Sequence, residues 1–244
     1  MCRGAELHVR KMRTDRMMNR DDFRRSHFAG GLLVSPSRPE RPTLKLGRLD
    51  LPRAVDNRAY CTAIEDQGRT PWCAAYTAAA FAENVTWRRD GFITQVEPEP
   101  IYTWAKQHDG AKDEDGTTLD MACEALRSLG VFDKSICRTR MIRTIDDLKA
   151  AIHRFGCALG GFAITDEWYE LYASGLENVT GARHNASRGG HAVLVVGYNP
   201  AGIWVENSWG SSWGAQGFAF VEWGAVKRQF IYGAVLTHCL DGFN

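Results

Sequence analysis

The sequence lacks any long apolar stretch. No run within its 244 residues approaches the roughly 18 apolar residues that a membrane-spanning helix needs. The first 25 residues are rich in arginine and have no apolar core of the kind found in secretory signal peptides. We therefore expect no membrane span, and a location that is either cytoplasmic or reached by export without a cleavable signal peptide.

Cysteine patterns typical of metal sites are also missing. The chain has seven cysteines, an odd number, and they form no CxxC pair and no spacing of zinc ligands. We therefore predict no bound metal.

A large charge of one sign is absent as well. The formal charge is +1, although residues 1–53 hold 13 Lys or Arg against 6 Asp or Glu, and residues 54–244 hold 17 against 23. A basic leader thus precedes a mildly acidic body, and this distribution does not favour nucleic-acid binding.

The sequence does contain enough apolar material for a core. Hydrophobic residues make up 44% and aromatic residues 11%, which excludes global disorder, and the length suits one large domain or two lobes. Helical periodicity in the first half of the body and strand-like runs in the second predict an α+β chain. The expected helices are Ala74–Trp87 (opened by Cys73), Pro98–Gln107, Thr117–Leu129, Thr144–Phe155 and Asp166–Ser174. The expected strands are Ala158–Ile164, Ala192–Gly197, Ile203–Asn207, Phe218–Glu222 and Ile231–Leu236.

One cysteine stands where a helix is predicted to begin. Gln67 lies six residues before Cys73, Pro71 can sit in the first helical turn, and Gly91 can cap the end. A thiol at a helix N-terminus feels the positive end of the macrodipole and unpaired N–H groups, which favour the thiolate. Cys73 is therefore a candidate nucleophile.

Two later stretches supply candidate partners for this thiol. His191 follows a Gly-Gly pair and opens an apolar run that is typical of a buried strand, and Asn207 ends a short strand before two Trp-Gly pairs. The imidazole has an unperturbed pKa of about 6.5 and so exchanges protons near neutrality. We expect His191 to act as general base and acid, and Asn207 to accept a hydrogen bond that orients the ring.

Cysteine, histidine and asparagine in this order, each within its own motif, resemble the papain-like cysteine peptidases of the C1 family. The resemblance begins near Leu51–Asp56, which looks like the mature N-terminus of that family, and continues with gaps to about Leu236. It implies a leader of residues 1–50 and a peptidase domain of residues 51–244. The implied fold has a helical N-terminal lobe and a β-barrel-like C-terminal lobe, with the active-site cleft between them.

The resemblance also assigns further roles. Gln67 would donate its side-chain amide to the oxyanion, beside the backbone N–H of Cys73. Gly116 and Gly190 would bind substrate together with Trp209, whose indole would also shield the histidine–asparagine hydrogen bond from water. Trp213 would be structural.

The sequence departs from the family around the nucleophile. Thr70 stands where many members have the cysteine of a conserved disulfide, and residues 113–116 offer it no partner. The resemblance therefore implies that this disulfide is absent and, with it, a reducing compartment. Pro71-Trp72 replaces the usual Gly-Ser pair and Ala74 the usual tryptophan, which suggests a reshaped cleft and resembles a bacterial branch of the family.

Together these residues predict a cysteine endopeptidase that acts on a protein or peptide substrate through a thioester, without metal or organic cofactor. Two alternatives stay open. The same triad could serve a transamidase, deamidase or isopeptidase, since the acyl-enzyme is shared, or the chain could be an inactive peptide-binding module whose cleft Trp72 narrows.

The role of the leader also stays open, and prolines make its residues 35–42 an extended linker. It could be a flexible segment, a short pro-segment in contact with the cleft, as in a zymogen, or a targeting segment of an exported bacterial effector.

Overall fold

The structure, a computed structural model, describes residues 31–34, 41–47, 49–172, 174–182 and 187–239. The first 30 residues of the leader and most of its predicted linker lie outside this part of the chain. None of the helices in the described ranges is long and apolar enough to cross a membrane.

Helix α2 (Cys73–Asp90) runs through the centre of the molecule, and 12 of its 18 residues are buried. Gly91 ends it in the left-handed conformation, with φ of 76°, and donates its N–H to the carbonyl of Trp87. Both ends therefore lie close to their predicted positions. Pro71 precedes the N-cap residue Trp72 and is thus outside the helix, so its predicted place in the first turn was wrong.

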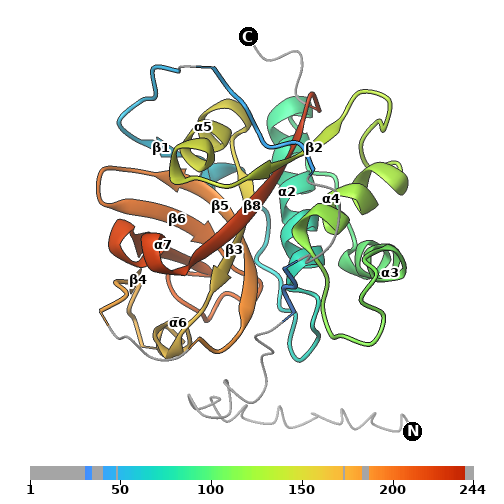
Figure 1. Cartoon of the computed structure of the whole chain (residues 1–244). Coiled ribbons are helices and arrows are strands. Elements are labelled where there is room, and N and C mark those ends of the chain that lie inside the picture. Colours follow the sequence, from blue (N-terminus) through green and yellow to red (C-terminus); the bar gives the residue numbers. More distant parts are fainter. Residues whose placement is uncertain (1–30, 35–40, 48, 173, 183–186, 240–244) are drawn as a thin grey trace, which may run out of the picture.

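Two further helices pack beside α2 and form the helical lobe (Figure 1). They are α3 (Pro98–His108) and α4 (Leu119–Ser128). Thr118 caps α4, because its hydroxyl accepts a hydrogen bond from the N–H of Met121 at 3.3 Å.

The other lobe is built on one mixed sheet with strand order β2-β8-β3-β5-β6-β7-β4, to which β1 adds by pairing with β5. The strands are β1 (Val55–Asp56), β2 (Arg138–Ile142), β3 (Ala158–Ala163), β4 (Asn178–Val179), β5 (Gly190–Tyr198), β6 (Gly202–Glu206), β7 (Phe218–Glu222) and β8 (Phe230–Thr237). The sheet does not close, so the predicted barrel-like lobe was wrong in this detail, whereas the α+β two-lobe architecture is confirmed.

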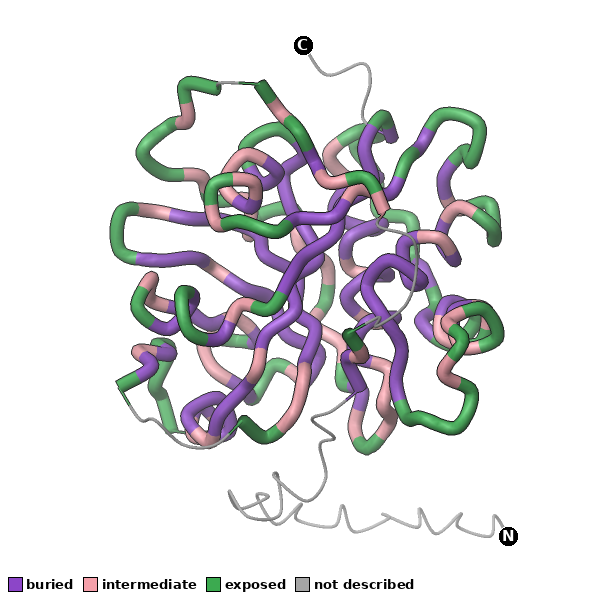
Figure 2. Tube along the Cα trace, in the orientation of Figure 1, coloured by how far each residue is buried: buried purple, intermediate pink, exposed green. Residues whose placement is uncertain are grey.

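Short helices complete the structure. They are η1 (Arg58–Tyr60), α5 (Ile145–Phe155), α6 (Asp166–Glu170) and α7 (Trp223–Gln229). Helix α2 and the central strands β3 and β5, which pack against it, are mostly buried (Figure 2). The contact between α2 and these strands, which we call the seam between the lobes, is therefore part of the core.

The described parts of the leader lie against both lobes. Residues 31–34 run between α4 and β5, where Leu32 donates its N–H to the carbonyl of Gly190. Residues 42–44 pair with β2, because Met141 donates to Pro42 and Leu44 donates to Met141. Arg41 also forms ion pairs with Asp120 and Glu124 on α4, so the leader contacts the body at two separate places.

A disulfide joins Cys137, just before β2, to Cys239, just after β8, with their Cα atoms 5.2 Å apart. It differs from the disulfide that the family places near Thr70. The chain nevertheless contains a disulfide. Because disulfides form in oxidising environments, this bond does not support the predicted reducing compartment.

Candidate active site

The thiol of Cys73 lies at the first position of α2, facing the first residues of β5. The backbone amide of Ala192, the residue after His191, is within hydrogen-bonding reach of this thiol. The antiparallel pairing of β3 with β5, in which Phe162 lies opposite His191, fixes the strand against which α2 packs. The fold thus brings together two residues that are 118 positions apart in the sequence.

The imidazole of His191 and the side chain of Asn207 form a hydrogen bond of 2.8 Å between Nε2 and Oδ1. The N–H of Ser208 donates to the same Oδ1 at 2.8 Å, which identifies this atom as the carbonyl oxygen of the amide. Because Oδ1 accepts, Nε2 must carry the proton, and Nδ1 is left for proton exchange on the other side of the ring.

The indole of Trp209 covers this pair. Its ring lies 4.6 Å from the imidazole of His191, between centroids, and 4.9 Å from the ring of Tyr169. Both Trp209 and His191 are fully buried, so water is excluded from the hydrogen bond. Trp213 lies behind Trp209 and donates its Nε1–H to the carbonyl of Trp168, a position that fits its predicted structural role.

The side-chain amide of Gln67 is held from both ends. Its Oε1 accepts a hydrogen bond of 2.6 Å from the hydroxyl of Ser208, and its Nε2 donates to the carbonyl of Thr70 at 3.0 Å. A primary amide carries two N–H groups, so a second donor stays available. The backbone N–H of Gln67 also donates to the carbonyl of Ser208, which ties the loop of Gln67 to the residue after Asn207.

Residues 31–34 of the leader lie between the two lobes, where the active-site cleft is predicted. Thr117 donates its N–H to Gly31 and accepts one from Leu33, both at 3.0 Å, so the segment runs parallel to Thr117. On the other side Leu32 donates to Gly190 at 3.2 Å. The leader therefore pairs with the residue before His191 and with the residue after Gly116.

Gly116 is predicted to bind substrate, and the structure places it against the leader. Its φ is +87°, and a Cβ there would lie 2.1 Å from the carbonyl oxygen of Gly31. Only glycine permits both this backbone conformation and this close approach. Gly116 and Gly190 thus both meet the segment in the cleft. The indole of Trp209 instead lies tilted against the imidazole of His191 and stacks on the ring of Tyr169.

The side chain of Leu32 fills a pocket that sequence reasoning missed. Its Cδ2 lies 2.6 Å from where a Cβ on Gly161 of β3 would be, and Leu119 of α4 borders the same space. Tyr232 of β8 closes the arrangement, since its hydroxyl donates to the carbonyl of Leu33 at 2.9 Å and accepts from the N–H of Leu119 at 3.2 Å. Nothing in the local sequence of Tyr232 distinguishes it from any aromatic residue of a buried strand.

Burial raises the pKa of the Cys73 thiol to about 12, and the nearby backbone amides lower it by less. The helix N-terminus was predicted to favour the thiolate. In this structure the cost of burying a charge outweighs that effect, because Cys73 is fully buried in the occupied cleft. In the covered form of the site, burial thus opposes the thiolate that the helix N-terminus favours, and the thiolate stays a prediction.

Comparison with known proteins identifies a family to which this chain is similar. The family model described as "Papain family cysteine protease" matches residues 97–233, which include His191 and Asn207 but not Cys73. Cathepsin K of Mus musculus is 26% identical over 224 residues, covering 78% of this chain and 67% of that protein. Cathepsin L of Sarcophaga peregrina is 24% identical over 201 residues, covering 69% of this chain and 58% of that protein.

The chain spans little more than half the length of several of these relatives, for example 56% of cathepsin L1 of Drosophila melanogaster. Among solved structures, the cysteine protease xylellain from Xylella fastidiosa superposes with a TM-score of 0.69 at 19% identity, covering 85% of this chain and 95% of that one. Procathepsin B from Trypanosoma congolense gives 0.65 at 18% identity, covering 85% of each chain. At these low sequence identities, the structural similarity shows only that this chain shares their fold.

Proposed function

Since this chain belongs to the papain family of cysteine proteases, we propose that it is a cysteine endopeptidase whose catalytic residues are Cys73, His191, Asn207 and Gln67. The observation that carries the proposal is the convergence of all four within one buried patch at the seam of the lobes. Each comes from a different segment, and together they would supply the nucleophile, the base, the group that orients the base and an oxyanion donor, which thiol-dependent acyl transfer requires.

The proposed reaction begins with attack of the Cys73 thiolate on a peptide carbonyl. The proton of the thiol goes to Nδ1 of His191, because Nε2–H is engaged with Asn207. The developing oxyanion is stabilised by the backbone N–H of Cys73 and by the second N–H of Gln67. His191 then protonates the leaving amine, giving a thioester, and afterwards takes a proton from the water that hydrolyses it.

The hydrogen bonds of Gln67 support its role as a donor. The Ser208 hydroxyl binds the Oε1 atom, so the amide cannot rotate to turn its oxygen toward the oxyanion without losing that bond. A donor fixed in advance in this way needs no reorganisation during the reaction.

We further propose that residues 31–34 keep the enzyme inactive until they leave the cleft, as a pro-segment would. Two observations support this. The segment pairs with Thr117 and Gly190 on both walls, and Cys73 beneath it is fully buried with a raised pKa. Removal of the segment would return water to the thiol and lower the cost of forming the thiolate–imidazolium pair.

The division into a leader of residues 1–50 and a peptidase domain of residues 51–244 is kept as part of the proposal, with one addition. Leu44 is buried against the body, so residues 41–46 would stay bound when residues 31–34 release. A bacterial source and export without a signal peptide stay predictions.

The test is covalent labelling of the full-length chain by an epoxysuccinyl peptide, read by mass spectrometry. We expect one adduct on Cys73, lost in Cys73→Ala and strongly reduced in His191→Ala. Leu32→Glu, which puts a charge into the buried pocket, should label faster than wild type. Val34→Glu is the matched control, since Val34 is 55% exposed, and should label at the wild-type rate.

No adduct on Cys73 in folded Leu32→Glu protein would contradict the peptidase and favour a peptide-binding module. Equal labelling rates in wild type, Leu32→Glu and Val34→Glu would refute the inhibitory leader while leaving the enzyme proposal in place.

A further inference from the structure

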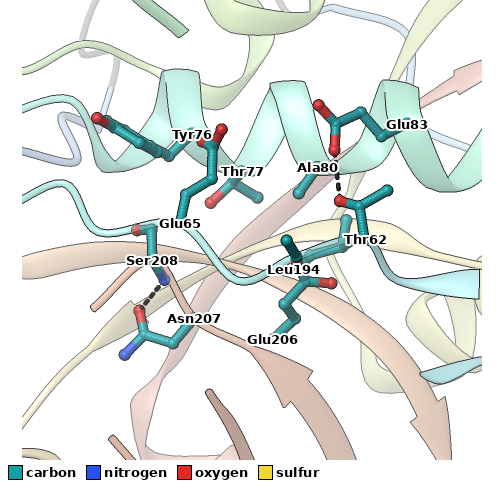
Figure 3. Close-up of a pocket in the computed structure, with 11 residues that line it drawn as sticks. Thr62, Glu65, Tyr76, Thr77, Ala80, Glu83, Leu194, Glu206, Asn207 and Ser208 are labelled. Carbon is teal, nitrogen blue, oxygen red and sulfur yellow. Dashed lines mark hydrogen bonds between the residues drawn. The ribbon is translucent and has the colours of Figure 1, made fainter. Parts of the chain in front are cut away.

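A small cavity of about 20 Å³ lies beside the active site, between α2 and strands β5 and β6 (Figure 3). Asn207 and Ser208 form part of its wall, so it borders the residue that orients His191. The volume suffices for about one water molecule.

Three carboxylates line this cavity, and each comes from a segment that carries a proposed catalytic residue (Figure 3). Glu65 lies two residues before Gln67, Glu83 lies on the helix that begins at Cys73, and Glu206 directly precedes Asn207. No lysine, arginine or histidine is found among the lining residues. No cation among the lining residues would therefore balance negative charge on these groups.

The carboxylates of Glu83 and Glu206 differ in their partners. Glu83 accepts hydrogen bonds at both oxygens, from the hydroxyl of Thr62 and from the N–H of Val96 at 2.9 Å, as an ionised group does. Glu206 is only 6% exposed, and its Oε2 has no hydrogen-bond partner. A buried carboxylate in that condition is costly, whereas a neutral carboxylic acid is much less so and brings its own donor.

We propose that Glu206 is a positioning residue that binds a proton, and that this proton holds Asn207, and through it His191, in the active arrangement. Loss of the proton would place like charges on Glu206 and Glu83, on opposite sides of the seam between β6 and α2. Their repulsion would separate the strand that ends at Asn207 from the helix that begins at Cys73. This inference rests on the proposed function only where it concerns catalysis. The protonation of Glu206 does not depend on it.

The surroundings of Glu206 favour its neutral form. Burial raises its pKa to about 7, and the charges of Glu83 and Glu65 act in the same direction, against a hydrogen bond from the thiol of Cys61. Burial likewise raises the pKa of Glu65 to about 7.

Other titratable groups face the same region from neighbouring elements. They are Tyr76 on α2 and Cys157 before β3, on which the charge of Arg88 also acts. Burial raises the pKa of the Cys61 and Cys157 thiols. None of these groups places a cation on Glu206, so its ionised form would have no counterion.

A proton fits this cavity better than a metal ion does. Within the ranges that the structure describes, no group of three or more His, Cys, Asp and Glu residues is arranged to hold a metal.

The experiment is NMR of the full-length protein, which needs no catalytic turnover. With ¹³C-labelled glutamate carboxyls, we expect the carboxyls of Glu206 and Glu65 to titrate near pH 7, and one of these two signals to disappear in Glu206→Gln. The Nε2–H resonance of His191, protected by burial, should broaden above pH 7 in wild type. It should persist to higher pH in Glu206→Gln, while the exposed-residue control Glu114→Gln should behave as wild type.

Identical pH dependence of the His191 resonance in wild type and Glu206→Gln would overturn the proposal, as would a titration that shifts with added Na⁺ or Ca²⁺. If Glu206→Gln does not fold, Glu83→Gln gives the second test. Removing its charge should lower the pKa of Glu206 by about one unit or more, and an unchanged value would refute the coupling. Loss of peptidase activity alone affects only the proposed function.

Discussion

At the scale of single residues, each proposed catalytic side chain is held by a neighbour from another segment. Asn207 binds His191, and Ser208 binds Gln67, so two adjacent residues orient both the base and the oxyanion donor. The sequence around Asn207 could suggest the first contact, since the Asn-Ser-Trp-Gly motif resembles the family. It could not reveal the second, because a serine hydroxyl has many possible acceptors.

Gln67→Ala should therefore reduce kcat by about 10²–10³ with little effect on KM, because one oxyanion donor is lost. Ser208→Ala keeps that donor but frees its orientation, and we expect a smaller loss of kcat. Steady-state kinetics on a peptide substrate, in the Leu32→Glu background, measure both. A Gln67→Ala enzyme with unchanged kcat would exclude Gln67 from the oxyanion site.

Tyr232 allows a second prediction at this scale. Tyr232→Phe removes the donor to Leu33, and since one neutral hydrogen bond contributes about 1 kcal/mol, labelling of Cys73 in the full-length chain should accelerate about fivefold. Tyr198→Phe is the matched control, because the hydroxyl of Tyr198 donates to Pro52 outside the cleft contacts. Equal rates in the two variants would show that Tyr232 does not hold the leader.

At the scale of elements, periodicity and capping residues predicted the long helices and the central strands well. The helix predicted at Asp166–Ser174 instead ends at Glu170, because Tyr172 pairs with the distant Trp213. Strand β2 was missed, since its alternating arginines resemble a surface segment and its partner β8 lies some 95 positions away. Short elements that depend on distant partners cannot be read from local patterns.

The disulfide between Cys137 and Cys239 belongs to this scale, because it joins the segments next to β2 and β8. It closes a loop of 102 residues, so replacing both cysteines by serine should lower the free energy of unfolding by about 2–4 kcal/mol. Urea unfolding of the oxidised protein and the double variant measures the difference. Equal stability would show that the bond is not formed in the purified protein.

At the scale of the whole molecule, the seam between the lobes is where site, leader and buried charge meet. Sequence resemblance predicted that the active-site cleft would lie between the two lobes. It did not predict that the seam holds Glu83 and Glu206 in one cavity, because the two residues are remote in sequence and lie in unremarkable contexts. Glu83 of α2 and Glu206 of β6 come to line the same cavity only in the folded chain.

Stability should therefore depend on pH through Glu206. Burial raises its pKa from 4.5 to about 7 in the folded protein, so between these values the folded chain keeps a proton that the unfolded chain has lost. The free energy of unfolding should fall by ~3 kcal/mol as pH rises through this window and then level off. Urea unfolding from pH 4.5 to 8 measures this, and Glu206→Gln should remove the part of the fall that is due to Glu206, leaving the smaller part due to the less buried Glu65, whose pKa burial also raises to about 7. A parallel curve for the variant would contradict the assignment.

The most direct test of the central claim is product analysis in ¹⁸O-labelled water. Leu32→Glu protein is incubated with a denatured protein substrate, and the products are examined by mass spectrometry. We predict backbone fragments whose new C-terminal carboxylates carry one ¹⁸O atom, and none with Cys73→Ala in the same background. An uncut backbone, with or without conversion of glutamine side chains, would contradict the assignment of this chain as an endopeptidase.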